Sequence, residues 1–283
     1  MNESSLSSVS WASHLRALYA IVVKDWLHFI RYPLNALFGV LQPITWLLPV
    51  YFMGKSFATP EGNVGFAAYT GTVDYMSFIL LGAVLSEYLS AVLWGMGYSL
   101  KNEMDSGVLE ANWMTPMPRA LLLVGRTIAS LGITTVNALG VLLLGWLLFG
   151  FRITGSLLGA VGSALPMLIA LYGFGFAFAA LVLLVREPNT MIDVGNFVLM
   201  GLSGSNFPIQ VLPRFLVPVS LAIPLTYGYD AVRGYLLHTR TILPLRLEIA
   251  ILIGFMGLMV PLGYLIFRGV ERRCRQLGTL GMH

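Results

Sequence analysis

Long apolar runs separated by short polar segments dominate this chain of 283 residues. About 20 apolar residues let an α-helix cross the roughly 30 Å hydrocarbon core of a membrane. Six runs are candidates for such spans, although the fifth is too short for a full crossing by itself: residues 35–53, 73–100, 121–149, 157–185, 190–204 and 247–267. The pattern predicts an all-α integral membrane protein with six transmembrane helices, built as one transmembrane domain over residues 1–283.

The composition supports lipid as the solvent of this fold. Hydrophobic residues make up 57% of the chain and charged residues 11%, whereas soluble domains are about 45–50% apolar and about 25% charged. The net charge of +4 is carried by basic residues at the ends of apolar runs, which sets topology and does not indicate nucleic acid binding.

Two segments outside the regular spans have characteristic patterns. Residues 12–31 repeat apolar side chains at three- and four-residue spacing between charged ones, which predicts an amphipathic helix at the membrane surface; packing on the protein's own core is the alternative. Residues 205–246 are apolar but broken by prolines, among them Pro208, Pro213 and Pro224. They predict a re-entrant pair of short helices in the outer leaflet.

The distribution of lysine and arginine predicts the orientation. With six spans both termini share one side, and 11 of the 17 basic residues lie there, against 6 on the other side. Basic residues accumulate in the cytoplasm, so we expect a bacterial-type inner membrane protein with both termini, including the tail at 268–283, in the cytoplasm.

No recognisable catalytic motif occurs in the sequence. There is no G-x-x-x-x-G-K-[ST] phosphate loop, no G-x-S-x-G and no H-E-x-x-H, so ATP binding by the phosphate-loop route is excluded. The four histidines and one cysteine are scattered and suggest no metal site. We therefore expect neither an enzyme nor a resident cofactor.

Few polar side chains fall inside the spans. Glu87 lies well inside the second span, where an acid faces protein or water, and Asn196 lies in the fifth. Both are candidates for a substrate path, although a Glu87 that is hydrogen-bonded at a helix interface is the favoured alternative. Asp230 and Arg233 are three residues apart on a predicted helix and are expected to pair with each other.

The polar stretch between the second and third spans, residues 101–119, combines acids with apolar anchors at helical spacing. It predicts a short helix for a hydrophobic groove on a partner, or a helix lying on the bilayer, and the pattern alone leaves both open. The residues that carry the pattern are Glu103, Asp105, Leu109, Glu110, Trp113 and Met114.

Residues 101–126 resemble the coupling-helix region of ABC transporter permeases of the second exporter type. The motifs that carry the resemblance are Glu103 and Asp105, Ser106-Gly107, Leu109-Glu110, Trp113-Met114, Thr115-Pro116, Arg119 and Gly125. Two further stretches are similar to the same family, the segment 206–234 with its Pro-Leu-Thr at 224–226 and the basic tail at 271–281. Residues 31–35 and 42–43 resemble the drug and lipid exporter branch.

The resemblance implies a role and partners for the chain. It implies a permease that exports a hydrophobic or amphipathic substrate, with an elbow helix at 12–31 and a coupling helix between spans 2 and 3. It also implies two ABC ATPase subunits, which would bind ATP and Mg, and a second permease in a homodimer or heterodimer within membrane lipid. Export of lipid-linked polysaccharide is the alternative, and a secondary transporter is disfavoured because Glu87 is nearly alone at membrane depth.

Overall fold

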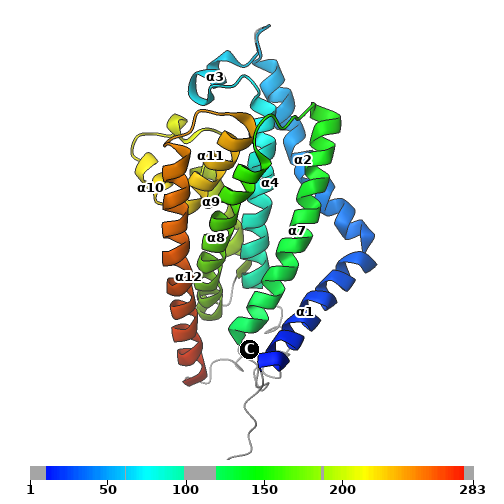
Figure 1. The fold of residues 1–283 in the computed structure, drawn as a ribbon, viewed down its shortest axis with the longest axis vertical. Helices are drawn as coiled ribbons and strands as arrows, with labels where there is room; N and C mark the ends of the chain where they lie inside the picture. Colours follow the sequence, from blue (N-terminus) through cyan, green and yellow to red (C-terminus); the bar gives the residue numbers. More distant parts are fainter. Residues whose placement is uncertain (1–10, 61, 99–118, 186–187, 277–283) are drawn as a thin grey trace, which may run out of the picture.

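A computed structural model describes residues 11–60, 62–98, 119–185 and 188–276, which form helices and no β-strand (Figure 1). Five helices within these ranges are long and apolar enough to cross a membrane. They are α2 (Pro33–Ser56), α4 (Tyr75–Leu93) with its π-helical extension η2 (Trp94–Tyr98), α7 (Arg119–Phe149), α8 (Leu157–Val185) and α12 (Leu245–Gln276).

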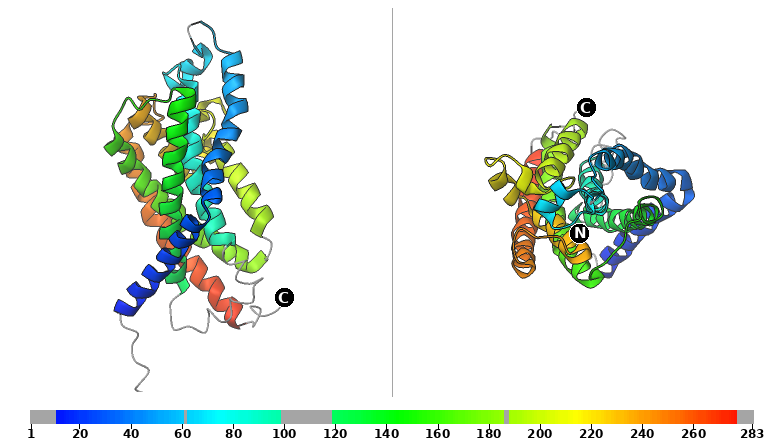
Figure 2. Two further views of the ribbon diagram at one scale, coloured as in Figure 1. Left: turned by 90° about the vertical axis from the view of Figure 1, so that its right-hand side faces the viewer. Right: turned by 90° about the horizontal axis from the view of Figure 1, so that it is seen from above.

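The predicted N-terminal amphipathic segment forms α1 (Trp11–Arg31). Proline lacks an N–H and restricts the residue before it, so Pro33 separates α1 from α2 and occupies the first turn of α2. Helix α1 runs obliquely across the lower part of the bundle (Figures 1 and 2) and packs on α7. Gly132 of α7 allows this contact, because a Cβ there would lie 2.7 Å from the Trp26 ring.

The fifth predicted span corresponds to α9 (Pro188–Leu202). Its 15 residues extend about 22 Å at a rise of 1.5 Å per residue, which is less than a full hydrocarbon core. The chain then forms η3 (Ile209–Val211), α10 (Val217–Leu221) and α11 (Pro224–Leu237). These elements stay in the half of the bundle that carries α3 (Val64–Thr70).

The last span is longer than predicted. Helix α12 continues beyond residue 267 to Gln276, because the arginines and Glu271 of the basic tail are good helix formers and no proline interrupts them. The beginning of α1 and the end of α12 therefore lie at the same end of the bundle, opposite α3 (Figure 1).

Burial differs sharply between the spans. In the apolar stretches of α4 and α8, 67% and 61% of residues are buried, against 17% for α2 and 11% for α12. Glycines let the central helices approach closely. A Cβ on Gly173 would lie 2.5 Å from the backbone of Met259 in α12.

Candidate functional site

The predicted partner-binding segment cannot be placed in this architecture. Glu103, Asp105, Leu109, Glu110, Trp113 and Met114 lie outside the described residues. The described chain before this segment ends with η2, and the chain after it begins with α7, both at the end of the bundle where α1 begins (Figure 1).

Helix α4 is buried on most of its circumference but has one partly open stripe. Ala83, Glu87, Ala91 and Trp94 of this stripe recur at helical spacing and retain partial exposure, as do Tyr88 and Ser90 beside them, whereas residues 84–86, 89, 92 and 93 are buried. Glu87 follows Tyr75 by twelve residues, which places it about 18 Å along the helix and near the middle of the span. Its carboxyl group makes no hydrogen bond or ion pair with any described residue.

The same stripe faces α9. The Ser90 hydroxyl donates to Oδ1 of Asn196 over 3.2 Å, so the structure brings Asn196 to the face of α4 that carries Glu87, one turn away. Both α2 and α9 contact α4, and Figure 2 shows them on its two sides. Among the described residues Asn196 has a hydrogen-bond partner and Glu87 has none, so a hydrogen-bonded Glu87 at a helix interface stays a prediction.

A second polar cluster surrounds the side chain of Arg233 on α11 and is buried. The Arg233 guanidinium is 2% exposed and donates to three backbone carbonyls: Phe78 over 3.0 Å, Gly204 over 2.7 Å, and Ser205. It also lies 3.5 Å from the centre of the Phe78 ring, a cation–π contact. These bonds join α11 to α4 and to the loop after α9.

Asp230 and Arg233 attract each other electrostatically as expected, but the hydrogen bonds of each side chain go to other groups. Asp230 Oδ2 accepts from the Ile242 N–H over 2.6 Å, so it holds the loop before α12. Glu248, in the first turn of α12, accepts from the Leu243 N–H over 3.0 Å. The guanidinium is instead bound by carbonyls that lie 155, 29 and 28 residues away in the chain, which no local spacing rule could anticipate.

The prolines of the predicted re-entrant segment set the path of the chain. Pro224 lies in the first turn of α11, where a missing N–H costs nothing. Pro208 precedes η3, and Pro213 follows it in the connection to α10. They bring α11 to the place where Arg233 reaches the carbonyls, and a catalytic arrangement is not formed there.

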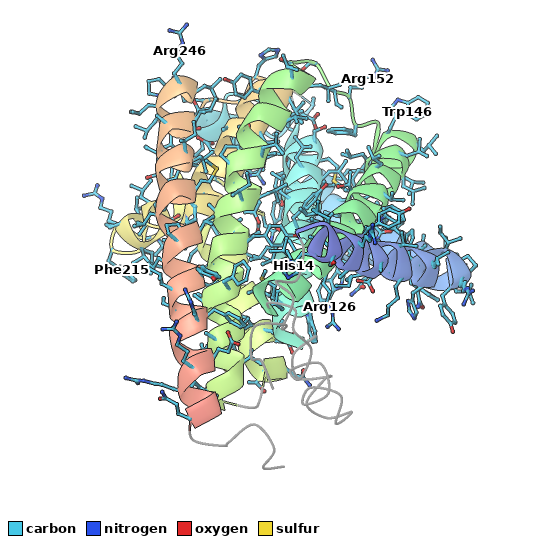
Figure 3. All side chains as sticks on the ribbon, turned by 60° about the horizontal axis from the view of Figure 1, so that its bottom comes forward. His14, Arg126, Trp146, Arg152, Phe215 and Arg246 are labelled. Atoms are coloured by element: carbon cyan, nitrogen blue, oxygen red, sulfur yellow. The ribbon has the colours of Figure 1, made fainter. Side chains whose placement is uncertain are left out.

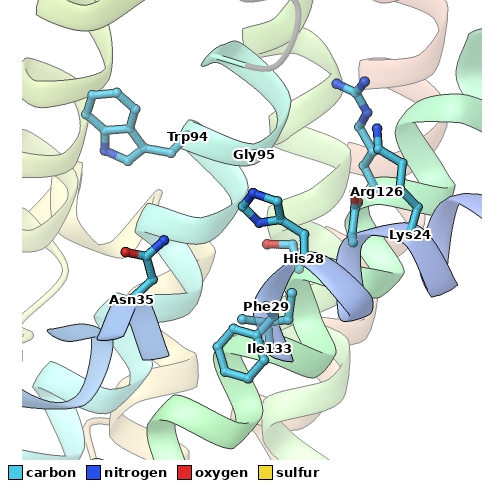
Figure 4. A pocket seen from close by; sticks show the side chains of 10 residues that line it. Lys24, His28, Phe29, Asn35, Trp94, Gly95, Arg126 and Ile133 are labelled. Atoms are coloured by element: carbon cyan, nitrogen blue, oxygen red, sulfur yellow. The ribbon is translucent and has the colours of Figure 1, made fainter. Parts of the chain in front are cut away.

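The sequence did not predict a cavity of about 460 Å³ between α1, α2, η2 and α7 (Figure 4). Its polar lining comes from Lys24, Asp25, His28, Asn35, Arg126 and Ser130, and its apolar lining from Phe29, Trp94 and Ile133. Lys24 and His28 are four residues apart and so share one helix face. This spacing is the one sequence feature that indicated a polar site here. Arg126 enters from α7, about a hundred residues later in the chain.

The outer surface gives the chemical context of these sites. Trp46, Phe197, Trp146 and Phe215 are more than half exposed, and Figure 3 shows Trp146 and Phe215 pointing away from the bundle. Such surfaces belong in lipid or against another membrane subunit. Arg152 and Arg246 lie at the end with α3, whereas Arg126 lies towards the other end (Figure 3).

Comparison with known proteins gives two matches. A family model described as ABC-2 type transporter matches residues 16–237, from α1 to the end of α11. The daunorubicin resistance ABC transporter permease protein DrrB1 of Streptomyces coeruleorubidus is 25% identical over 244 residues, which cover 85% of this chain and 82% of that protein.

Proposed function

Because the chain belongs to the ABC-2 type transporter family, we propose that it is the permease of an exporter for drug-like or lipid-like amphipathic molecules. The chain is an integral membrane permease, and its family implies partnership with an ABC ATPase subunit. The drug-resistance relative supports export. The substrate would leave the cytoplasm or the inner leaflet, driven by ATP hydrolysis in the partner.

The proposed topology has six crossings, with α9 as the fifth and α10–α11 as the re-entrant segment. Two observations support it: both ends of the described chain lie at one end of the bundle, and α9 is followed by elements that remain in the opposite half. In this topology the termini are cytoplasmic, the membrane is a bacterial inner membrane, and α1 is the elbow helix at its surface.

The proposed assembly contains two permeases, as a homodimer or heterodimer, and two ATPase subunits that bind ATP and Mg. Residues 103–114 would transmit ATPase closure to α4 and α7, because the segment connects these two helices directly. Leu109, Trp113 and Met114 would fill a groove of the ATPase, and Glu103, Asp105 and Glu110 would form the charged contacts.

The proposed substrate path runs along the open stripe of α4, between α2 and α9. The observation that carries this assignment is the carboxyl group of Glu87, which is near mid-membrane and has no partner among the described residues. An acid in that position is costly unless it faces water, protein or a cationic ligand. A second permease placed against the exposed faces of α2 and α9 would enclose the stripe and complete the path.

The first test is co-purification of the chain with the ABC ATPase encoded beside it, followed by ATPase assays in proteoliposomes. We expect a stable complex whose substrate-stimulated activity falls at least tenfold in Trp113→Ala. Trp146→Ala is the matched control, since Trp146 is 56% exposed on the outer face of α7, and should leave the activity unchanged.

Three results would contradict the proposal in different ways. Failure to associate with the ATPase would reject the proposed coupling of this permease to that subunit. Full coupling in Trp113→Ala would reject the role of residues 103–114. Equal losses in Trp113→Ala and Trp146→Ala would show a general effect of removing a tryptophan.

A further inference from the structure

We propose that the cavity beneath α1 binds the headgroup of an anionic phospholipid of the phosphatidylglycerol type, which carries a phosphate and free hydroxyl groups. The cavity is defined by Lys24, Asp25, His28, Asn35, Arg126 and Ser130 together with its apolar lining. The assignment to lipid rests on the placement of α1 at the membrane surface in the proposed topology.

Four polar side chains of the cavity lining have no hydrogen-bond or ion-pair partner among the described residues. Lys24, Asp25, His28 and Asn35 all line it, yet none of their side chains makes a hydrogen bond or ion pair with another described residue. Figure 4 shows Lys24 and Arg126 on one side of the cavity, His28 in the middle, and Asn35 on the other side. Such an arrangement offers several donors and acceptors to a ligand from outside the chain.

The charges of the lining match this class of headgroup. Lys24 and Arg126 carry positive charge on one side of the cavity, which suits a phosphate. Asp25 can accept hydrogen bonds only, so it needs a donor such as a headgroup hydroxyl, and the Asn35 amide can donate and accept. The volume of about 460 Å³ lies within the usual range for small-molecule sites.

An exposed apolar face of α2 begins one helical turn from the cavity. Leu34, Leu37, Phe38 and Leu41 lie three and four residues apart on α2, so they share one face. Leu34 is 66% exposed and Phe38 63% exposed. Phe38 lies one helical turn after Asn35, which lines the cavity. A ligand whose phosphate occupies the cavity would therefore place its acyl chains along α2, which a soluble phosphate could not do.

The test is native mass spectrometry of the full chain, purified in detergent and titrated with phosphatidylglycerol, phosphatidylethanolamine, phosphatidylcholine or glycerol phosphate. We expect phosphatidylglycerol to bind best. Lys24→Gln should weaken it about fivefold, which corresponds to ~1 kcal/mol for one basic residue near a lipid surface. Lys55→Gln makes the same chemical change at the opposite end of α2 and should have no effect. Arg16→Gln, on α1 but outside the cavity, should also have none.

Each other outcome overturns the proposal. Unchanged affinity in Lys24→Gln, or equal losses in Arg16→Gln, would show that the cavity is not the site. Tighter binding of phosphatidylethanolamine or phosphatidylcholine would reject the anionic headgroup, and equal binding of glycerol phosphate would reject lipid as the ligand. Because no ATPase is involved, loss of the lipid site and failure of the exporter assignment give separate results.

Discussion

The charged side chains of α11 have hydrogen-bond partners within the chain, whereas Lys24 of α1 and Glu87 of α4 have none among the described residues. Arg233 and Asp230 on α11 end on backbone groups of the same chain, through bonds of 2.6–3.0 Å and a further bond from Arg233 to the Ser205 carbonyl. Glu87 on α4 and Lys24 on α1 have no such partner among the described residues. The first group holds the architecture together, and we propose that the second binds other molecules.

The two kinds of charge also lie in differently packed surroundings. Arg233 is buried among α4, α11 and the loop after α9, where an unpaired charge would cost several kcal/mol. Lys24 lies on an exposed face of α1, and Glu87 on the only open stripe of α4 among the described residues. Substitutions should therefore separate stability from function.

The largest effect is expected for Arg233→Met. The change leaves three enclosed carbonyls without a donor, and one lost buried partner alone costs about 1–3 kcal/mol, so we expect loss of most of the folded protein. Cys274 is buried and is the single cysteine, so its reaction with a thiol dye on heating reports unfolding. Arg246→Met, on the exposed first turn of α12, is the control. Equal melting temperatures of the two variants would contradict the structural role of Arg233.

Gly82→Ala should destabilise the same contact without removing a charge. A Cβ at Gly82 would collide with the Ser205 carbonyl and the Arg233 guanidinium, and overpacking of this kind costs about 1–3 kcal/mol. The control is Gly162→Ala on α8, where a Cβ meets nothing within 4 Å. That variant should be neutral or slightly more stable, because alanine favours the helix. A lower melting temperature in Gly162→Ala than in Gly82→Ala would contradict the packing argument.

Glu87→Gln should impair transport while leaving the fold intact. Hydrogen bonds to charged groups contribute about 1.5–3 kcal/mol, so we expect at least a tenfold loss in efflux of an amphipathic cation from proteoliposomes containing the ATPase. Efflux of a neutral amphiphile should change less. Asp74→Asn is the matched acid-to-amide control, since asparagine can still accept the Ser77 N–H at that helix cap. Unchanged cation efflux in Glu87→Gln would end its assignment to the path.

The smallest effect is expected for Asn196→Ala. It removes the bond from Ser90 between α4 and α9, which should cost about 0.5–1.5 kcal/mol and a few degrees of melting temperature. Ser90→Ala is its natural comparison, and the double variant should be no worse than the more damaging single variant. Fully additive losses would show that the two side chains act independently.

Much of the helical architecture could be predicted from local patterns. The limits 157–185 agree with α8, and the segment 12–31 agrees with α1 to within one residue, because apolar periodicity and proline are properties of neighbouring residues. The number of crossings remains a prediction, since α9 is shorter than a full span.

The sequence by itself determined that this chain is a bundle of apolar helices that belongs in a membrane, and it placed most helix ends. Only the tertiary structure decided which charges are satisfied. Arg233 donates to the carbonyl of Phe78, 155 residues earlier, and Lys24 of α1 and Arg126 of α7 line one cavity. Hydropathy is local and can be read along the chain, whereas a hydrogen-bond partner is set by the three-dimensional packing of distant segments.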